Sequence, residues 1–193
     1  MTNRRIGVLA LQGAVAEHMD MIGRAGAKAS GVVYASDLAH LDALIIPGGE
    51  STAISRLIQK NGLYDAIVGF AKRRFLLGTC AGLVLCATKV AENEKNDRLI
   101  PLQLMDMTVC RNGFGRQTDS FETDMRIEGI GNDVPGVFIR APYIERVGKG
   151  VNVLAKVGGK IVMAETPNVL AASFHPELTD DMRVMDYFCA KIR

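Results

Sequence analysis

Apolar runs of strand length alternate with amphipathic helical segments through the first half of the sequence. The run "IGVLAL", residues 6–11, is continuously apolar, as expected of a strand buried on both faces of a parallel sheet. Val15, Met19 and Ile22 then recur at helical spacing, and this helix is expected to end near Gly26. Three further apolar runs continue the succession, at 30–34, 43–46 and 75–77. The alternation predicts an α/β layered domain built on a parallel sheet.

Three more helical segments accompany these strands. Ile54, Leu57 and Ile58 share one face of a helix that Gly62 is expected to end. A second helix is predicted at 63–74, directly before the strand 75–77, and a third at 81–90, directly after it.

The second half is richer in short strands. The predicted ones lie at 104–109, 120–128, 136–141, 152–157 and 161–165, with a tight hairpin turn at Gly158-Gly159. Residues 169–174 are expected to return to the core as a strand, and the charged stretch 92–98 to form a surface loop. A closing helix carries apolar side chains on one side: Met182, Met185, Phe188, Cys189 and Ile192. The mainly parallel sheet therefore gains antiparallel additions late in the chain.

Length and charge narrow the function classes. The 193 residues suit one domain, 1–193, large enough to bury a core without disulfides or metals. The formal net charge is +2 and the basic residues are scattered, which argues against a nucleic-acid or membrane-surface binder. No apolar stretch reaches membrane-spanning length, and residues 6–11 are expected to be a strand, not part of a secretory signal. The four cysteines lack metal or disulfide spacing, which indicates free thiols in a reducing cytoplasm and no metal site.

The stretch "GTCAG", residues 78–82, places a cysteine where a strand turns into a helix. The flanking Gly78 and Gly82 relieve crowding in such a turn, as in the G-x-S-x-G nucleophile elbow. Cys80 would lie at a helix N-terminus, which favours thiolate and lowers the pKa of a thiol, and the Ala81 N–H would face a developing oxyanion. The alternative is that Cys80 is a small buried hydrophobe.

His175 is the histidine best placed to act as a base. It directly follows a predicted core strand, and functional groups in open α/β sheets collect at the carboxyl ends of strands. Pro176 holds the chain extended, so that Glu177 at i+2 returns to the same side and orients the imidazole. The alternative is a hydrogen-bonded core histidine, and that interpretation is kept for His18 and His40, as structural or surface residues.

The stretch "IIPGGEST", residues 45–52, is a strand that enters a helix through two glycines. Its exposed N–H groups suit a negatively charged oxygen, so Gly48 and Gly49 are candidates for a second oxyanion donor. The other interpretation is a plain tight turn capped by Ser51 or Thr52, with Glu50 near the helix start.

The motifs "PGGES", "GTCAG" and "FHPEL", in this order, resemble those of class I (triad-type) glutamine amidotransferases. The stretches "LALQGAVAEH", "GGEST", "RNGFGRQTDSFE" and "FIRAPYI" are similar to the family of glutaminase subunits of pyridoxal 5'-phosphate synthase. The resemblance spans the chain from its first strand to its last helix. It implies a flavodoxin-like, three-layer fold with helices on both faces of the sheet.

By this resemblance, Cys80 attacks the side-chain amide of L-glutamine, His175 manages the protons and Glu177 orients it. The resulting thioester is hydrolysed to L-glutamate. The residues implied in glutamine binding are Gly49, Glu50, Ser51, Arg111, Ile139 and Arg140. A guanidinium suits a substrate carboxylate, but each arginine equally suits an internal acid, and Ile139 offers only packing or backbone groups.

The resemblance also implies a partner and no cofactor. Family members pass ammonia to a (β/α)-barrel synthase subunit, within a large hetero-oligomer that makes pyridoxal 5'-phosphate. Docking of that barrel is expected to order the oxyanion loop of a poorly active free subunit.

The sequence leaves two alternatives. One is a stand-alone cysteine hydrolase or a redox sensor with the same elbow cysteine, and the His-x-Glu pair and the arginine motifs weigh against it. The other is a scaffold without activity, and the presence of Cys80, His175 and Glu177 together weighs against that role.

Overall fold

The computed structural model describes residues 4–91, 98–111, 113–114 and 120–192. The strands are β1 (Arg5–Leu9), β2 (Lys28–Val32), β3 (Ala43–Ile46), β4 (Phe75–Thr79), β5 (Ala87–Val90), β6 (Met105–Cys110), β7 (Ser120–Ile127), β8 (Gly131–Ile139), β9 (Tyr143–Val147), β10 (Asn152–Val157), β11 (Lys160–Glu165) and β12 (Val169–Ala172). The helices are α1 (Val15–Arg24), α2 (Ser51–Lys60), α3 (Tyr64–Ala71), α4 (Ala81–Cys86) and α5 (Arg183–Lys191). Two 3₁₀ turns lie at Ala35–Leu38 and Pro176–Leu178.

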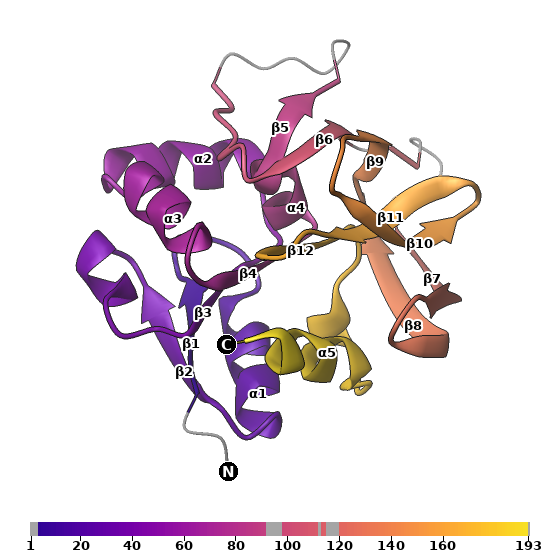
Figure 1. Cartoon of the computed structure of the whole chain (residues 1–193), viewed down its shortest axis with the longest axis horizontal. Helices are drawn as coiled ribbons and strands as arrows, with labels where there is room; N and C mark the ends of the chain where they lie inside the picture. The colour runs from indigo at the N-terminus through magenta and orange to yellow at the C-terminus, as the bar shows by residue number, and fades with distance from the viewer. Residues whose placement is uncertain (1–3, 92–97, 112, 115–119, 193) are drawn as a thin grey trace.

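A single large sheet runs through the molecule in the order β2-β1-β3-β4-β12-β11-β9-β6-β5, with β10 beside β11 (Figure 1). From β2 to β12 all neighbouring strands are parallel, so their carboxyl ends meet at one edge. Strands β9, β10 and β11 then add antiparallel pairs. The predicted parallel sheet with late antiparallel additions is confirmed.

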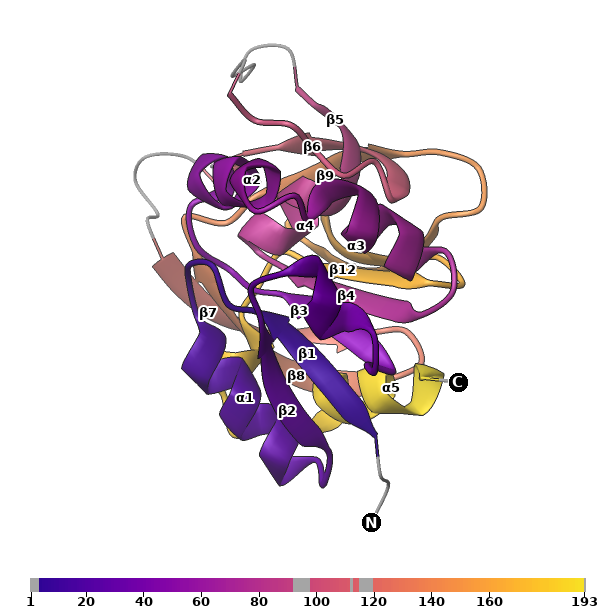
Figure 2. The ribbon, with the colours of Figure 1, turned by 90° about the vertical axis from the view of Figure 1, so that its left-hand side faces the viewer.

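Helices cover both faces of this sheet (Figure 2), which confirms the three-layer α/β prediction. Alternation along each strand builds the two cores: in β3, Leu44 and Ile46 join the core under α2, α3 and α4, whereas Ile45 joins the core under α1 and α5. The separate hairpin of β7 and β8 extends the second core, with Phe138 fully buried in it.

Several sequence predictions need correction. The helix predicted at 81–90 ends at Cys86, and residues 87–90 continue as β5 against β6. Strand β2 begins two residues earlier than predicted, and β9 was not predicted. The turn at Gly158-Gly159 is confirmed, since both residues have positive φ, 54° and 79°. Of the predicted surface loop 92–98, residues 92–97 lie outside the described part, as does much of "RNGFGRQTDSFE".

No helix in the described part of the chain is long and apolar enough to cross a membrane.

The parallel strands β3, β4 and β12 position the candidate site, because the loops that follow them carry its residues.

Candidate active site

Cys80 occupies a strained turn between β4 and α4. Its backbone has φ 50° and ψ −104°, a region that non-glycine residues rarely adopt. The Cys80 N–H donates to the Ala172 carbonyl of β12 at 2.8 Å, which fixes the turn to the neighbouring strand. Such strain is typical of a nucleophile elbow, where a tight turn projects one side chain above the sheet.

The two glycines around Cys80 are required by close backbone approach. A Cβ on Gly82 would lie 2.0 Å from the Ile46 carbonyl oxygen of β3, and one on Gly78 would lie 2.6 Å from the Gly82 carbonyl oxygen. Both distances are far shorter than any van der Waals contact. The steric reason inferred from "GTCAG" therefore holds in the structure.

His175 and Glu177 form a buried pair beside this turn. His175 follows β12 and donates its backbone N–H to the Val137 carbonyl of β8 at 2.8 Å. Its Nδ1 lies 2.7 Å from Glu177 Oε1. The contact was expected, but the predicted extended geometry is wrong: Pro176–Leu178 is a 3₁₀ turn, and this turn brings the carboxylate back under the ring.

Electrostatics keep this pair ionised. Burial alone would lower the pKa of His175, but hydrogen bonds to Cys80 and Glu177 and the charges of both raise it to about 10. Burial would raise the pKa of Glu177, but the His175 hydrogen bond and the charges of His18 and His175 lower it. The imidazole is thus protonated at neutral pH and lies between a sulfur and a carboxylate, an arrangement suited to stabilising a thiolate.

The loop after β3 closes the site from the other side. Gly48 lies against the imidazole, since a Cβ there would be 2.4 Å from His175 Cε1 and 3.3 Å from Cys80 Cβ. The Gly48 carbonyl accepts from Ala14 N–H at 3.3 Å, and the Glu50 N–H donates to Gln12 Oε1 at 2.9 Å. The loop between β1 and α1 therefore holds the glycine loop in place.

Glu50 itself caps α2. Its carboxylate accepts from the N–H groups of Thr52 and Ala53 at 2.9 and 2.7 Å, so the expectation that Ser51 or Thr52 caps the helix is wrong. Burial would raise the pKa of Glu50, but these hydrogen bonds and the Arg111 charge lower it. Arg111 Nη2 lies 3.7 Å from Glu50 Oε1, so this arginine pairs with an internal acid.

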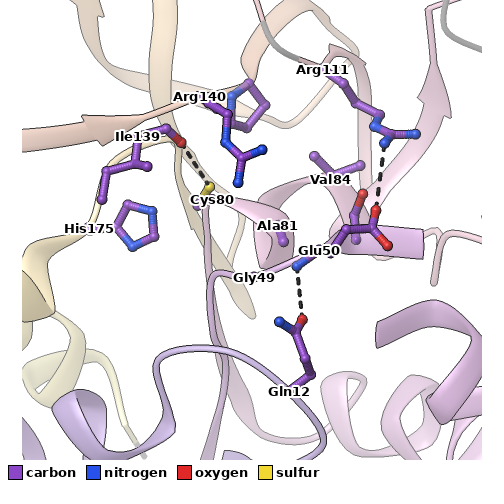
Figure 3. A pocket seen from close by; sticks show the side chains of 12 residues that line it. Gln12, Gly49, Glu50, Cys80, Ala81, Val84, Arg111, Ile139, Arg140 and His175 are labelled. Atoms are coloured by element: carbon purple, nitrogen blue, oxygen red, sulfur yellow. Dashed lines mark hydrogen bonds and ion pairs between the residues drawn. The ribbon is translucent and has the colours of Figure 1, made fainter. Parts of the chain in front are cut away.

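These residues line one pocket of about 380 Å³, within the usual size of small-molecule sites (Figure 3). The predicted residues among its walls are Gly49, Glu50, Ser51, Cys80, Ala81, Arg111, Ile139, Arg140 and His175. Two predicted residues lie outside the lining: Gly48, which backs the loop, and Glu177, whose side chain is fully buried behind His175.

Ile139 and Arg140, at the end of β8, form the wall opposite the glycine loop. The Ile139 carbonyl lies 3.9 Å from Cys80 Sγ, so this residue reaches the sulfur through its backbone. Arg140 has φ 42°, a second strained backbone beside the sulfur. Figure 3 shows its guanidinium directed toward Cys80 across the pocket.

Three lining residues were not predicted: Gln12, Val84 and Pro142. For Gln12 a signal existed, because it is the polar residue that ends the apolar run of β1. Val84 is an apolar residue of a helix and Pro142 part of a loop, and neither carries a local signal of function.

Of the other two histidines, His40 is exposed, and His18 is fully buried. His18 Nε2 lies 3.4 Å from Glu177 Oε2 and 3.1 Å from Thr79 Oγ1. The interpretation of His18 as a structural residue omitted this contact with the candidate site.

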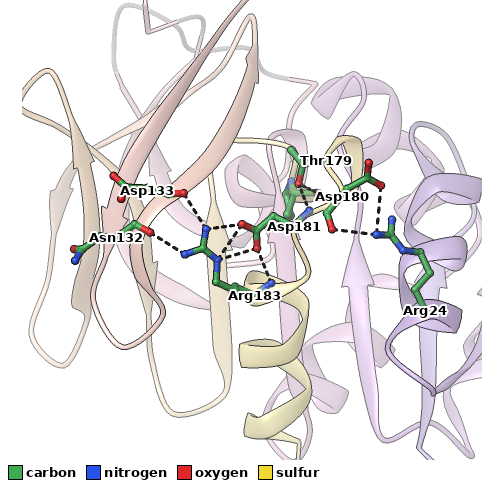
Figure 4. A network of polar contacts seen from close by, with 8 residues as sticks. Arg24, Asn132, Asp133, Thr179, Asp180, Asp181 and Arg183 are labelled. Atoms are coloured by element: carbon green, nitrogen blue, oxygen red, sulfur yellow. Dashed lines mark hydrogen bonds and ion pairs between the residues drawn. The ribbon is translucent and has the colours of Figure 1, made fainter.

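A polar network fixes the segment that follows Glu177 (Figure 4). Arg183 binds the Asp181 carboxylate and donates to the carbonyls of Asn132 and Asp133, both at 2.8 Å. Arg24 of α1 donates to the Asp180 carbonyl at 3.1 Å. The chain after the 3₁₀ turn is thus tied to α1 and to the β7–β8 hairpin.

A second, larger cavity of about 840 Å³ lies beside α2 and is lined by Arg56, Lys60, Arg98 and Ile100, among others. Among the described residues that line it there is no cysteine, histidine or acid, so these residues offer no comparable chemistry. Within the described residues, no group of three or more His, Cys, Asp or Glu side chains is placed to hold a metal ion.

Comparison with known proteins adds a family. The model of the SNO glutamine amidotransferase family matches residues 8–193. The chain is 52% identical to "Pyridoxal 5'-phosphate synthase subunit PdxT" of Niallia circulans, over 98% of each chain. It is 50% identical to the protein of the same name from Actinobacillus pleuropneumoniae serotype 5b, over 100% of this chain and 97% of the relative.

Solved structures agree. One described as "Crystal structure of glutamine amidotransferase" superposes with a TM-score of 0.90 at 42% identity, covering 97% of this chain and 98% of that one. "Structure of PurLQS from Thermotoga maritima" superposes with a TM-score of 0.73 at 16% identity, covering 100% of both chains, and shows the same fold alone.

Proposed function

The chain belongs to the SNO glutamine amidotransferase family, and we propose on this basis that Cys80, His175 and Glu177 hydrolyse L-glutamine to L-glutamate and ammonia through a thioester. The observation that carries the proposal is that the strained Cys80 turn and His175 line one pocket, with His175 Nδ1 2.7 Å from Glu177 Oε1. We further propose that residues 1–193 are one glutaminase domain.

In the first step the Cys80 thiolate attacks the amide carbon of glutamine, and the C–S bond forms as the carbonyl oxygen becomes an oxyanion. The His175 imidazolium gives its proton to the amide nitrogen, and ammonia leaves as the C–N bond breaks. In the second step His175 takes a proton from water, whose oxygen attacks the thioester. As the C–O bond forms the C–S bond breaks, so Cys80 leaves as the thiolate beside the His175 imidazolium, and the product loses its carboxyl proton to solvent as L-glutamate.

Two backbone N–H groups are proposed to hold the oxyanion. That of Ala81 follows the nucleophile at the start of α4. The second is that of Gly49, which lines the pocket. Because the peptide is trans, this N–H points away from the Gly48 carbonyl, which faces Ala14. Gly48 provides the close backbone approach at His175.

Glutamine is proposed to bind with its amide at Cys80 and its charged end among Gly49, Glu50, Ser51, Arg111 and Arg140. A carboxylate oxygen of Glu50 suits the substrate ammonium, and a guanidinium suits the substrate carboxylate. Arg111 already pairs with Glu50, whereas Arg140 is directed into the pocket (Figure 3). Arg140 is therefore the better candidate for the carboxylate.

The relatives are named as a subunit of pyridoxal 5'-phosphate synthase, and we propose that the ammonia passes to another subunit of such a synthase, the (β/α)-barrel that the sequence resemblance implies. The assembly is expected to be a large hetero-oligomer in the cytoplasm, where the four thiols stay free. The Ala14–Gly48 hydrogen bond, 3.3 Å long, is weak for a backbone pair, so the glycine loop is a reasonable element for the partner to stabilise.

The test is glutamate release from L-glutamine by this chain, alone and mixed with the barrel subunit, in wild type and in Cys80→Ala. We expect release by the wild type that rises on mixing, and background release by Cys80→Ala. A stand-alone hydrolase would not respond to the partner, and a scaffold would release no glutamate. A Cys80→Ala variant as active as the wild type would overturn the proposal.

A further inference from the structure

His18 of α1 contacts both halves of the proposed active site from behind, and the reaction above gives it no role. Its side chain and that of Glu177 are both fully buried, with His18 Nε2 3.4 Å from Glu177 Oε2. The same nitrogen lies 3.1 Å from the hydroxyl of Thr79, the residue before the nucleophile. The two Glu177 oxygens thus face two different imidazoles, Oε1 that of His175 and Oε2 that of His18.

The protonation of His18 follows from its surroundings. Burial lowers its pKa, and the charge of His175 acts in the same direction, whereas the charges of Glu177 and Glu17 act against it. A neutral ring carries one N–H. Nδ1 has no hydrogen-bond partner among the described residues, whereas Nε2 faces a carboxylate and a hydroxyl. The proton therefore belongs on Nε2, which lies within hydrogen-bond distance of Thr79 Oγ1 and makes a longer, 3.4 Å polar contact with Glu177 Oε2.

From this geometry we infer that His18 is a positioning residue that holds the Glu177 carboxylate against His175. Within the described part of the chain, no donor meets normal hydrogen-bond geometry at Glu177 Oε2. Without the His18 N–H, Oε2 would be buried with nothing to compensate for its lost hydration, and the Glu177 carboxylate could rotate away from the His175 imidazole. An apolar side chain could fill the same space without the cost of burying a polar imidazole, so packing alone does not account for a histidine at this position.

The inference rests on the proposed glutaminase reaction, and it is tested with two variants. His18→Leu keeps the volume and removes the donor, whereas His18→Gln keeps an N–H donor near the position of Nε2. We expect kcat for glutamate release, measured with the barrel subunit, to fall about 10- to 100-fold in His18→Leu with KM changed less than about twofold, since small misplacements of catalytic groups cost this much. His18→Gln should recover most of the loss.

The second measurement is the proton NMR signal of the His175 Nδ1–H in the free chain, which a strong hydrogen bond to a carboxylate moves downfield. We expect this signal in wild type and in His18→Gln, and its loss or upfield shift in His18→Leu. The matched control is Met21→Ala, a loss of buried packing on the same helix that removes no polar group. It should lower the thermal unfolding midpoint and leave the signal and kcat unchanged.

The inference is overturned if His18→Leu keeps wild-type kcat and the downfield signal, or if Met21→Ala loses both as His18→Leu does. Failure of the proposed function is distinguishable. In that case the wild type itself releases no glutamate, or Cys80→Ala releases as much, while the NMR comparison still reports on the position of Glu177.

Discussion

The two arms of the active site are built in different ways. The Cys80 turn, residues 78–82, depends on side chains that are absent, because a Cβ at Gly82 would collide with the Ile46 carbonyl oxygen 2.0 Å away. The arm that carries His175 and Glu177 depends on polar partners that are present, supplied by His18 of α1, by the Val137 carbonyl of β8 and by Arg183 at the start of α5.

This difference decides how each arm tolerates change. Backbone atoms in a packed sheet cannot move away from a new methyl group, so the Cys80 turn should fail completely when its glycines are replaced. A carboxylate held by several separate contacts should lose function by degrees, one contact at a time. The predictions below follow from that contrast, in order of decreasing effect.

Gly82→Ala should have the largest effect. The new Cβ would lie 2.0 Å from the Ile46 carbonyl oxygen, so β3 and α4 must separate. We expect a loss of about 3 kcal/mol or more in the free energy of unfolding and glutamate release at background, because Cys80 moves with α4. Denaturant unfolding and the coupled glutaminase assay measure the two effects.

The matched control is Gly69→Ala in α3, where nothing lies within 4 Å of the new methyl group. It should stabilise the chain by roughly 0.5–1 kcal/mol, because alanine favours a helix interior over glycine, and leave glutamate release unchanged. A folded, active Gly82→Ala protein would mean that the turn is not sterically fixed.

Glu177→Gln should come next. Cys80 and the Glu177 carboxylate together raise the pKa of His175 to about 10 against the effect of burial, so loss of the carboxylate's hydrogen bond and charge lowers that pKa. Since the imidazolium is the acid that protonates the leaving ammonia, the high-pH limb of glutamate release, near 10 in wild type, should move to lower pH. We also expect a fall in kcat of about 10²-fold or more.

The control for this change is Glu165→Gln, a buried glutamate whose partners, Tyr187 and Lys191, lie away from the pocket. It should keep both kcat and the high-pH limb. A Glu177→Gln enzyme with an unmoved limb would show that Glu177 does not set the protonation of His175.

Arg183→Met should have a smaller effect. The variant keeps the aliphatic stem but loses the donors that join Asp181 to the carbonyls of Asn132 and Asp133 (Figure 4). Because this network is largely exposed and His18 still holds Glu177, we expect glutamate release to fall less than about tenfold and the thermal midpoint by about 2–4 °C.

Arg183→Lys sharpens this test, since it keeps the charge but lacks the planar fork that reaches three groups at once. It should behave like Arg183→Met. If the lysine variant matches the wild type, charge and not hydrogen-bond geometry holds the segment.

The contrast between the arms also explains what the sequence revealed. The requirement for Gly78 and Gly82 is local and steric, so the five letters "GTCAG" carry it, and the continuous apolar runs at 43–46 and 75–77 likewise predicted the strands β3 and β4. The helix after Cys80 was predicted too long, because neither its last turn nor the following "ATKV", residues 87–90, contains a glycine or proline that would end a helix. Only its pairing with β6 makes that stretch a strand.

The second arm was only partly predictable. The order of His175 and Glu177 was informative, but the 3₁₀ turn that joins them depends on contacts far away in the sequence. In α1 the predicted apolar face of Val15, Met19 and Ile22 is confirmed but incomplete: Ile22 is buried, Val15 and Met19 are half-buried against the same core, and the buried face also includes His18. Histidine is counted as a polar residue when the spacing of apolar residues is used to predict a buried face. The pattern therefore gave no indication that His18 is buried beside Glu177.

The smallest expected effect is the pH dependence of stability that His18 adds. Its pKa in the folded chain is lowered from 6.5 by burial, so below pH 6.5 the unfolded chain binds a proton that the folded chain does not. Stability must therefore fall as the pH falls below 6.5, with a slope from this group of at most about 1.4 kcal/mol per pH unit. In His18→Gln, denaturant unfolding between pH 7 and 5 should show a shallower fall than in the wild type. Equal slopes in the two proteins would mean that His18 takes up a proton in the folded state, and a charged His18 would then hold Glu177 as an ion pair instead of as a neutral donor.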